Sequence, residues 1–232
     1  SWSYLEQIYS WESYPAYWNG LAELCRKFCD RGIPFFFLAG IHPRSIPLDL
    51  PESSPLPARL SDALAFHMQS PLCLGMGELG LDTGSPREER ILRLQLDWAL
   101  ANLPEEKRIG IHTPRREKER VTLQTLALLE DYPSLQSRVL VDHVTPATWT
   151  FLQKTPYMMG ITLQDGKTSL PSFLQFMAGH GHNVDRIMLN SDGAKSLSLP
   201  FLQFLGDTEC LDTESRQALL RGNAARFFAL DL

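Results

Sequence analysis

The sequence contains little cysteine and no long hydrophobic run. Its 232 residues include only four cysteines, Cys25, Cys29, Cys73 and Cys210, too few for the disulfide framework of a small secreted domain. No stretch reaches the roughly 18 apolar residues that a membrane helix needs. The first residues also lack the basic start and apolar run of a secretory signal. We therefore expect a cytoplasmic protein without a membrane partner.

The sequence also lacks an excess of positive charge. Its 22 basic and 27 acidic residues give a formal net charge of −5. This balance argues against broad, non-specific binding to duplex DNA, although a small basic area around an active site remains compatible with it. The hydrophobic fraction of 44% and the charged fraction of 21% are those of an ordinary globular protein. We expect one domain that spans residues 1–232.

Short apolar runs alternate with segments that have helical periodicity. The pattern predicts six strands, at 35–41, 73–77, 108–112, 139–143, 157–163 and 186–192. It predicts helices at 21–30, from the end of a Pro/Ser-rich linker (43–57) to about 69, and from 85 onward. It also predicts helices at 118–132, 147–154, 169–178 and 213–228. The helix after Ser85 begins with a capping-box spacing, Ser85 to Glu88, and carries proline at its first position. Since no hairpin signal separates the strands, we expect a parallel α/β fold.

Ligand-type side chains follow the predicted strands. His42, Glu78, His112, His143 and Asp192 all lie at or just beyond the carboxyl end of a strand. In parallel α/β folds these ends lie on one face, so side chains there converge. Imidazoles and carboxylates together suit zinc, manganese or iron rather than calcium. A carboxylate that bridges, here Glu78, would permit two ions.

A basic stretch follows His112. Arg115, Arg116, Lys118 and Arg120 lie at the start of a predicted helix, whose backbone N–H groups favour anions. We expect Arg115 to point inward and bind an anionic substrate, whereas Arg116 and Arg120 read as an ordinary solvated turn. After another strand end, Lys167 is a second candidate for substrate binding.

Two other metal-like spacings are better explained without a metal. Cys25 and Cys29 are four residues apart on a predicted helix, but no second pair accompanies them, so we expect reduced thiols packed under the helix. The run His180-Gly181-His182 lies between a helix and the next strand. In a barrel that end is opposite to the site, which favours a solvated loop.

Five motifs together resemble the TatD-like metal-dependent hydrolases of the amidohydrolase superfamily. They are 40–43 (GIHP), 77–82 (GELGLD), 111–115 (IHTPR), 142–143 (DH) and 190–192 (NSD), and the likeness extends to 222–227 (GNAARF). The His-Thr-Pro-Arg and Asn-Ser-Asp forms look more like a divergent branch than like the nuclease branch, which usually has Glu-Thr-Asp in the latter place. The resemblance implies a TIM (β/α) barrel.

The resemblance also implies roles for individual residues. Glu78 would bridge two metals, His112 and His143 would bind the second, and Asp192 would bind the first and orient or deprotonate the attacking water. His42 would lie near the substrate phosphate. With one or two divalent ions (zinc, manganese or magnesium), the implied reaction is attack of metal-activated water on a phosphodiester or related ester, in a small molecule or a nucleic acid.

The chain departs from the family at its start. The family's first strand carries Asp-x-His-x-His, nothing here matches it, and six predicted strands fall short of the eight of a closed barrel. We expect that the first one or two strands are absent from this chain. If they are truly absent from the protein, a non-catalytic metal-binding or scaffold protein with a degenerate barrel is the alternative. A third interpretation is an open doubly wound sheet that binds a small anionic ligand.

Overall fold

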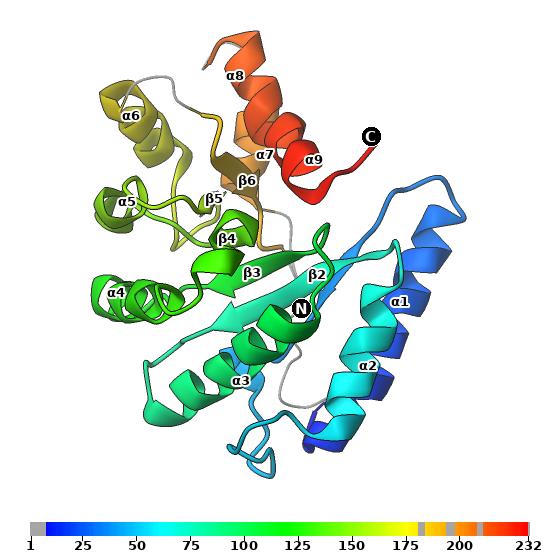
Figure 1. The fold of residues 1–232 in the computed structure, drawn as a ribbon. Helices are drawn as coiled ribbons and strands as arrows, with labels where there is room; N and C mark the ends of the chain where they lie inside the picture. The colour runs from blue at the N-terminus through cyan, green and yellow to red at the C-terminus, as the bar shows by residue number, and fades with distance from the viewer. Residues whose placement is uncertain (1–7, 181–183, 194–197, 208–210, 232) are drawn as a thin grey trace. The chain divides into compact units, whose positions relative to one another are not determined.

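The computed structural model describes residues 8–180, 184–193, 198–207 and 211–231. The chain divides into two compact units, Ser1–Arg138 (unit 1) and Val139–Leu232 (unit 2). Within the described residues, each unit contains three strands, and each alternates strands with helices (Figure 1). The prediction of one domain over 1–232 stays a prediction.

Unit 1 contains three parallel strands. They are β1 (Phe37–Ala39), β2 (Cys73–Gly80) and β3 (Arg108–His112), with β2 between the other two. The register pairs Gly80 with His112, which brings the carboxyl ends of β2 and β3 together. Gly80 has φ +137°, and a Cβ there would lie 2.5 Å from the carbonyl oxygen of His112, so only glycine permits this approach.

The helices of unit 1 bury one stripe each. They are α1 (Tyr14–Cys29), α2 (Ala58–Met68), α3 (Pro86–Asn102) and α4 (Lys118–Leu129), with 3₁₀ turns at Trp11–Ser13, Pro43–Ser45 and Pro133–Arg138. In Figure 1, α1 and α2 lie side by side. Tyr14, Trp18 and Cys25 of α1 are buried at helical spacing, as an amphipathic helix requires.

Unit 2 repeats the strand–helix order. Its parallel strands are β4 (Val139–Val141), β5 (Met158–Thr162) and β6 (Ile187–Asn190), with β5 in the middle. The helices are α5 (Pro146–Leu152), α6 (Leu170–His180), α7 (Leu199–Gly206), α8 (Thr213–Gln217) and α9 (Asn223–Phe228), and a π-helical turn, Ala218–Gly222, joins α8 to α9. Asn223 ties this C-terminal segment to β6, because its amide nitrogen donates to the carbonyl oxygens of Val184 and Ile187.

Six strands and their parallel direction within each unit confirm the α/β prediction. Several boundaries were wrong, and helix α7 was not predicted. Two of the boundary differences matter most. Helix α1 begins at Tyr14 rather than at residue 21, because Pro15 occupies the first turn, where its missing N–H costs nothing. Strand β2 continues to Gly80, so Glu78 lies inside it.

The spacing of Gly75, Gly77 and Gly80 resembles a dinucleotide-binding loop, but these residues lie within β2 and not at a strand-to-helix turn.

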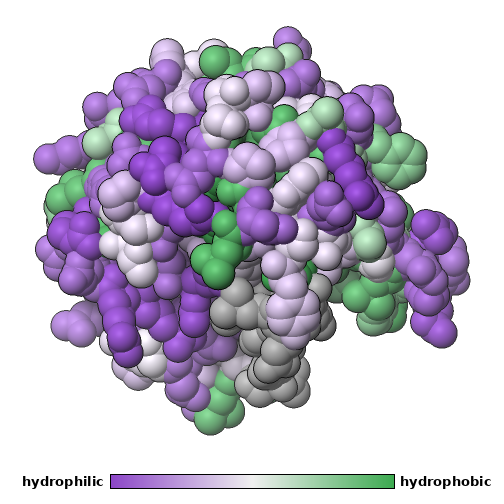
Figure 2. Space-filling model, turned by 90° about the horizontal axis from the view of Figure 1, so that it is seen from below, coloured by the Kyte–Doolittle hydropathy of each residue, from purple (hydrophilic) through white to green (hydrophobic). Residues whose placement is uncertain are grey.

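The described surface is mainly polar. Figure 2 shows one face, where hydrophilic side chains predominate and hydrophobic ones form small groups. Large exposed hydrophobic residues such as Leu48 and Phe66 are ordinary when they occur singly. Within the described part of the chain, no helix combines the length and the apolar character that a membrane span needs.

Candidate metal centre

In unit 1, three ligand-type side chains meet at the carboxyl ends of the strands. One ligand atom from each of His42, Glu78 and His112 lies within 4.8 Å of the other two. Glu78 lies between the rings: its Oε2 is 3.9 Å from Nε2 of His42 and its Oε1 is 3.9 Å from Nδ1 of His112. Two ligands of a tetrahedral zinc ion lie roughly 3.4 Å apart, so a small movement would close this spacing around an ion.

The surroundings of His42 fix the position of its hydrogen. The backbone N–H of Arg44 donates to Nδ1 at 3.0 Å, so this nitrogen carries a lone pair. Burial, together with the nearby charge of His112, lowers the pKa of His42 to about 2, and the ring is therefore neutral. Its hydrogen is then on Nε2, the nitrogen that faces Glu78. In this state the edge of His42 that faces Glu78 carries a hydrogen-bond donor and no lone pair for a metal.

The neutral form of His112 has the opposite arrangement: its lone pair, and not its hydrogen, lies on the side of Glu78. Its Nε2 lies 3.4 Å from Oδ1 of Asp82, which accepts a hydrogen bond. Burial alone would lower the pKa of His112, but hydrogen bonds to Asp82 and Glu78 and the charges of these carboxylates outweigh it and raise the pKa. In the neutral form, the hydrogen remains on Nε2 and the lone pair of Nδ1 faces Glu78. A carboxylate behind a ligating histidine is a common feature of metal sites.

Asp82 is itself held by a tightly bonded loop. The buried carboxylate of Glu88 accepts hydrogen bonds from the backbone N–H groups of Asp82, Thr83 and Gly84, each at 2.9 Å, and from the hydroxyl of Thr83 at 2.8 Å. The hydrogen bond to His112 lowers the pKa of Asp82, which keeps its carboxylate ionised. Its other oxygen lies 3.6 Å from Nε of Arg44.

Unit 2 contains a second group of predicted ligands. His143 and Asp192 follow β4 and β6, and both have left-handed backbone, with φ of 60° and 43°. Non-glycine residues adopt this conformation rarely, and such residues cluster at functional sites. Lys167 connects them: its ammonium is ion-paired with Oδ2 of Asp192 and lies 3.1 Å from Nδ1 of His143. The side chain of Lys167 is only 8% exposed, so this cation is held inside unit 2.

The side chain of Arg115 is exposed in unit 1. Lys118, three residues later, is half-buried, and its ammonium donates to the hydroxyl oxygen of Thr113 at 2.7 Å. The prediction that Arg115 binds substrate stays untested. His182 lies outside the described residues, as does the side chain of His180, so the prediction for this pair is untested too.

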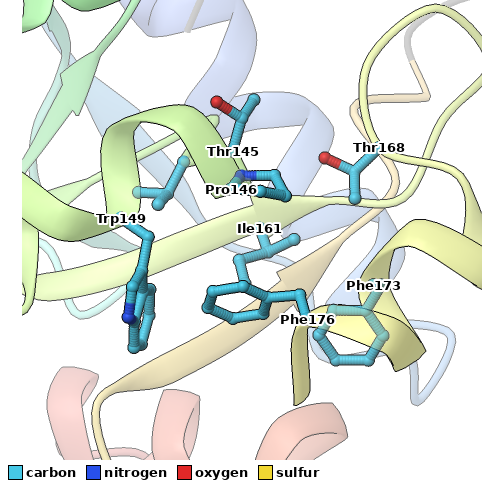
Figure 3. A pocket seen from close by; sticks show the side chains of 8 residues that line it. Thr145, Pro146, Trp149, Ile161, Thr168, Phe173 and Phe176 are labelled. Atoms are coloured by element: carbon cyan, nitrogen blue, oxygen red, sulfur yellow. The ribbon is translucent and has the colours of Figure 1, made fainter. Parts of the chain in front are cut away.

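Unit 2 also has an apolar pocket that is not a chemical site. It has a volume of about 200 Å³, counting the solvent at its mouth, and lies between α5, β5 and α6 (Figure 3). Trp149, Ile161, Phe173 and Phe176 supply most of the lining, and the rings of Trp149 and Phe176 meet edge to face at 4.6 Å. Thr168 adds a buried hydroxyl, which has no hydrogen-bond partner among the described residues. This lining offers no group that could activate water.

Comparison with known proteins agrees with this chemistry. No protein-family model matches the chain. An uncharacterized metal-dependent hydrolase of Methanocaldococcus jannaschii is 27% identical over 155 residues, 66% of this chain and 57% of that protein. The crystal structure of a TatD-like protein from Archaeoglobus fulgidus matches with a TM-score of 0.70 and 25% identity, over 97% of this chain and 85% of that one. The resemblance is to the TatD-like metal-dependent hydrolases.

A more distant structure adds support for the fold only. An amidohydrolase II matches with a TM-score of 0.52 and 14% identity, over 94% of this chain and 76% of that one. The TatD-like match confirms the prediction of a TIM-barrel fold in the α/β class. The matched stretch spans little more than half of the Methanocaldococcus protein, so the activity of the whole protein is a matter for proposal.

Sequence reasoning missed three side chains around the predicted TatD-like ligands. Asp82 lies in the GELGLD motif but received no role of its own, although it is four residues after Glu78 and follows the end of the same strand. Thr162 and Asn190, the last residues of β5 and β6, contact His143 and Asp142. Their positions at strand ends were the available signal, but neither is a usual metal ligand.

Proposed function

We propose that this chain is a divalent-metal-dependent hydrolase and that Glu78 and His112 hold a metal ion in unit 1. The observation that carries the proposal is the position of the Glu78 carboxylate, with one oxygen 3.9 Å from Nδ1 of His112 and the other 3.9 Å from Nε2 of His42. In its neutral form His112 has the lone pair on Nδ1, whereas His42 has its hydrogen on Nε2. One oxygen is then suited to a cation and the other to a neutral donor. His143 and Asp192 of unit 2 are proposed as further ligands, and Asp192 also as the catalytic base.

The proposed reaction is hydrolysis of a phosphodiester or a related ester, including deoxyribonuclease-type cleavage of nucleic acid. A bound zinc, manganese or magnesium ion would activate the attacking water and neutralise charge on the substrate. His42 would donate from Nε2 to an anionic oxygen, and Arg115 and Lys167 would bind the phosphate. Free thiols at Cys25 and Cys73, both buried, favour the proposed cytoplasmic location.

A non-catalytic metal-binding or scaffold protein is the second candidate. The observation that favours it is the ammonium of Lys167, which already pairs with Asp192 and lies beside His143 in unit 2. A cation held by the chain itself would reduce the need of these two side chains for a metal. The two candidates differ in turnover, and both allow a metal ion at Glu78 and His112 of unit 1.

The test compares Glu78→Gln with Glu130→Gln, which removes an exposed carboxylate at the end of α4. We expect wild type and Glu130→Gln to retain zinc or manganese through gel filtration and to hydrolyse bis(4-nitrophenyl) phosphate, a lactone or single-stranded DNA. Glu78→Gln should lose both properties while its circular dichroism spectrum stays unchanged. Metal retention without turnover would favour the second candidate, and equal metal content in all three proteins would refute the site at Glu78.

A further inference from the structure

Four polar side chains of unit 2 form a continuous chain of hydrogen bonds. Asp142 and His143 follow β4, and Thr162 and Asn190 end β5 and β6. Asp142 Oδ1 is 2.7 Å from the amide nitrogen of Asn190, and the Asn190 oxygen is 2.8 Å from the hydroxyl of Thr162. The same hydroxyl oxygen is 2.7 Å from Nδ1 of His143. Thr162 is 1% exposed and His143 6%, so the polar atoms of these two side chains depend on protein partners rather than on water.

The donor and acceptor of each hydrogen bond in this network follow from counting the available hydrogens. An ionised carboxylate only accepts, so Asp142 accepts from the backbone N–H of His143 at 2.7 Å and from the amide of Asn190. Since the Asn190 nitrogen faces Asp142, its oxygen must face Thr162. The hydroxyl of Thr162 has one hydrogen, and that hydrogen goes to the Asn190 oxygen. Toward His143, Thr162 can therefore only accept.

This count decides the tautomer of His143. An acceptor 2.7 Å from Nδ1 requires a hydrogen on Nδ1, which places the lone pair of the neutral ring on Nε2. We propose that Asp142, Asn190 and Thr162 are positioning residues that hold His143 in the Nδ1–H tautomer and so present its Nε2 to a divalent metal ion. The metal part of this inference rests on the proposed function; the tautomer does not.

Among the described residues, Lys167 offers a competing arrangement. Its ammonium has only donors, so a hydrogen bond to Nδ1 of His143 at 3.1 Å would need the lone pair on that nitrogen. The hydroxyl of Thr162 would then have two options. Either its oxygen lone pair faces the lone pair of Nδ1, or its hydrogen turns toward Nδ1 and away from the Asn190 oxygen. Both alternatives lose one of the two shorter contacts. Asp192 already provides the partner that the ammonium requires.

The backbone holds the carboxylate at the start of this chain in place. A Cβ at Gly160 of β5 would lie 2.2 Å from Oδ1 of Asp142, so the carboxylate occupies space that only a glycine leaves. The left-handed backbone of His143, with φ of 60°, turns its N–H onto the same oxygen. A carboxylate at position 190 would have no hydrogen to donate to Asp142. The amide of Asn190 has such hydrogens, and this explains why an asparagine suits this position.

The decisive measurement is the nitrogen-15 shift of His143 in metal-free protein, from long-range proton–nitrogen correlation at a pH where the ring is neutral. His143→Gln identifies its signals by their loss. We expect the Nδ1–H pattern in wild type, a changed or mixed pattern in Thr162→Val, and the wild-type pattern in Thr162→Ser, which restores the hydroxyl. Thr168→Val is the matched control: it removes another buried threonine hydroxyl of unit 2, one without a hydrogen-bond partner among the described residues.

Zinc titration of the same proteins connects the tautomer to metal binding. Affinity should fall about 10- to 100-fold in Thr162→Val, the usual loss when the support of a ligating histidine is removed, and should recover in Thr162→Ser. An Nε2–H pattern in wild type, or an unchanged pattern in Thr162→Val, would overturn the inference. If the tautomer responds as expected but no protein binds zinc, the proposed function fails and the tautomer assignment stands.

Discussion

His42 and His112 are 4.6 Å apart between ring centroids, yet they turn different edges toward Glu78. The backbone N–H of Arg44 occupies Nδ1 of His42, and Asp82 occupies Nε2 of His112. On the side of Glu78, the first ring therefore carries a hydrogen, and the second, in its neutral form, carries a lone pair that a cation could use. At the residue scale, the neighbours of each imidazole determine its role, because the side chain itself is the same.

Asp82 gives a direct test of this argument. Asp82→Ala removes the acceptor at Nε2 of His112, so the ring loses its fixed orientation, and zinc affinity should fall about 10- to 100-fold. Asp62→Ala, which removes an exposed carboxylate from α2, should leave affinity unchanged. Isothermal titration calorimetry measures both. Wild-type affinity in Asp82→Ala would show that His112 needs no support from this carboxylate.

At the element scale, the start of α3 holds the loop that carries Asp82. Ser85 caps the helix, since its hydroxyl oxygen accepts from the backbone N–H of Glu88 at 3.3 Å. In a full capping box, Glu88 would return a hydrogen bond to the backbone of Ser85. Instead its carboxylate accepts the three N–H groups of residues 82–84. The helix therefore fixes the end of the GELGLD motif as well as its own first turn.

Replacing Glu88 should consequently weaken the fold. The three N–H groups all bond one oxygen of Glu88, and the hydroxyl of Thr83 bonds the other. Glu88→Gln can keep an oxygen for the three N–H groups, but it loses the negative charge that strengthens all four hydrogen bonds and forces the Thr83 hydroxyl to reverse from donor to acceptor. The free energy of unfolding should therefore fall by about 2–3 kcal/mol. Its neighbour gives the control: Glu89 is part-exposed and pairs with Arg93 at 3.5 Å, so Glu89→Gln should cost less than about 1 kcal/mol. Urea unfolding measures both losses. Equal losses would contradict the role assigned to Glu88.

Much of the element order could be predicted from sequence, and particular details could not. The strand Arg108–His112 was predicted with its exact bounds, because an apolar run between polar residues is a strong local signal. The start of α1 was missed, since aromatic residues around Pro15 have no helical preference and the burial of Tyr14 and Trp18 comes from tertiary packing. The candidate ligands at strand ends could be named, but the side chains that orient them depend on contacts between strands, which a single sequence does not reveal.

At the scale of the whole molecule, a buried histidine outside the candidate metal centre makes stability depend on pH. His67 of α2 is 2% exposed and lies among Trp18, Phe37 and Phe66, with ring centroids 6.4, 5.6 and 5.3 Å away. Burial lowers its pKa. The folded chain therefore keeps His67 neutral at a pH where the unfolded chain, with the ordinary pKa of 6.5, already binds a proton.

This difference fixes the direction of the effect. The contribution of neutral His67 is fully present above pH 6.5 and is lost as pH falls below it, because the proton binds only the unfolded chain. His67→Leu removes the titrating group, so the stability lost between about pH 7.5 and 5.5 should shrink by about 1 kcal/mol. Urea unfolding of metal-free wild type and variant at the two pH values measures this difference. Leu changes packing equally at both pH values. A packing defect alone would therefore lower the free energy of unfolding of the variant by the same amount at each pH, and the loss between the two pH values would equal that of wild type. That result would contradict the prediction.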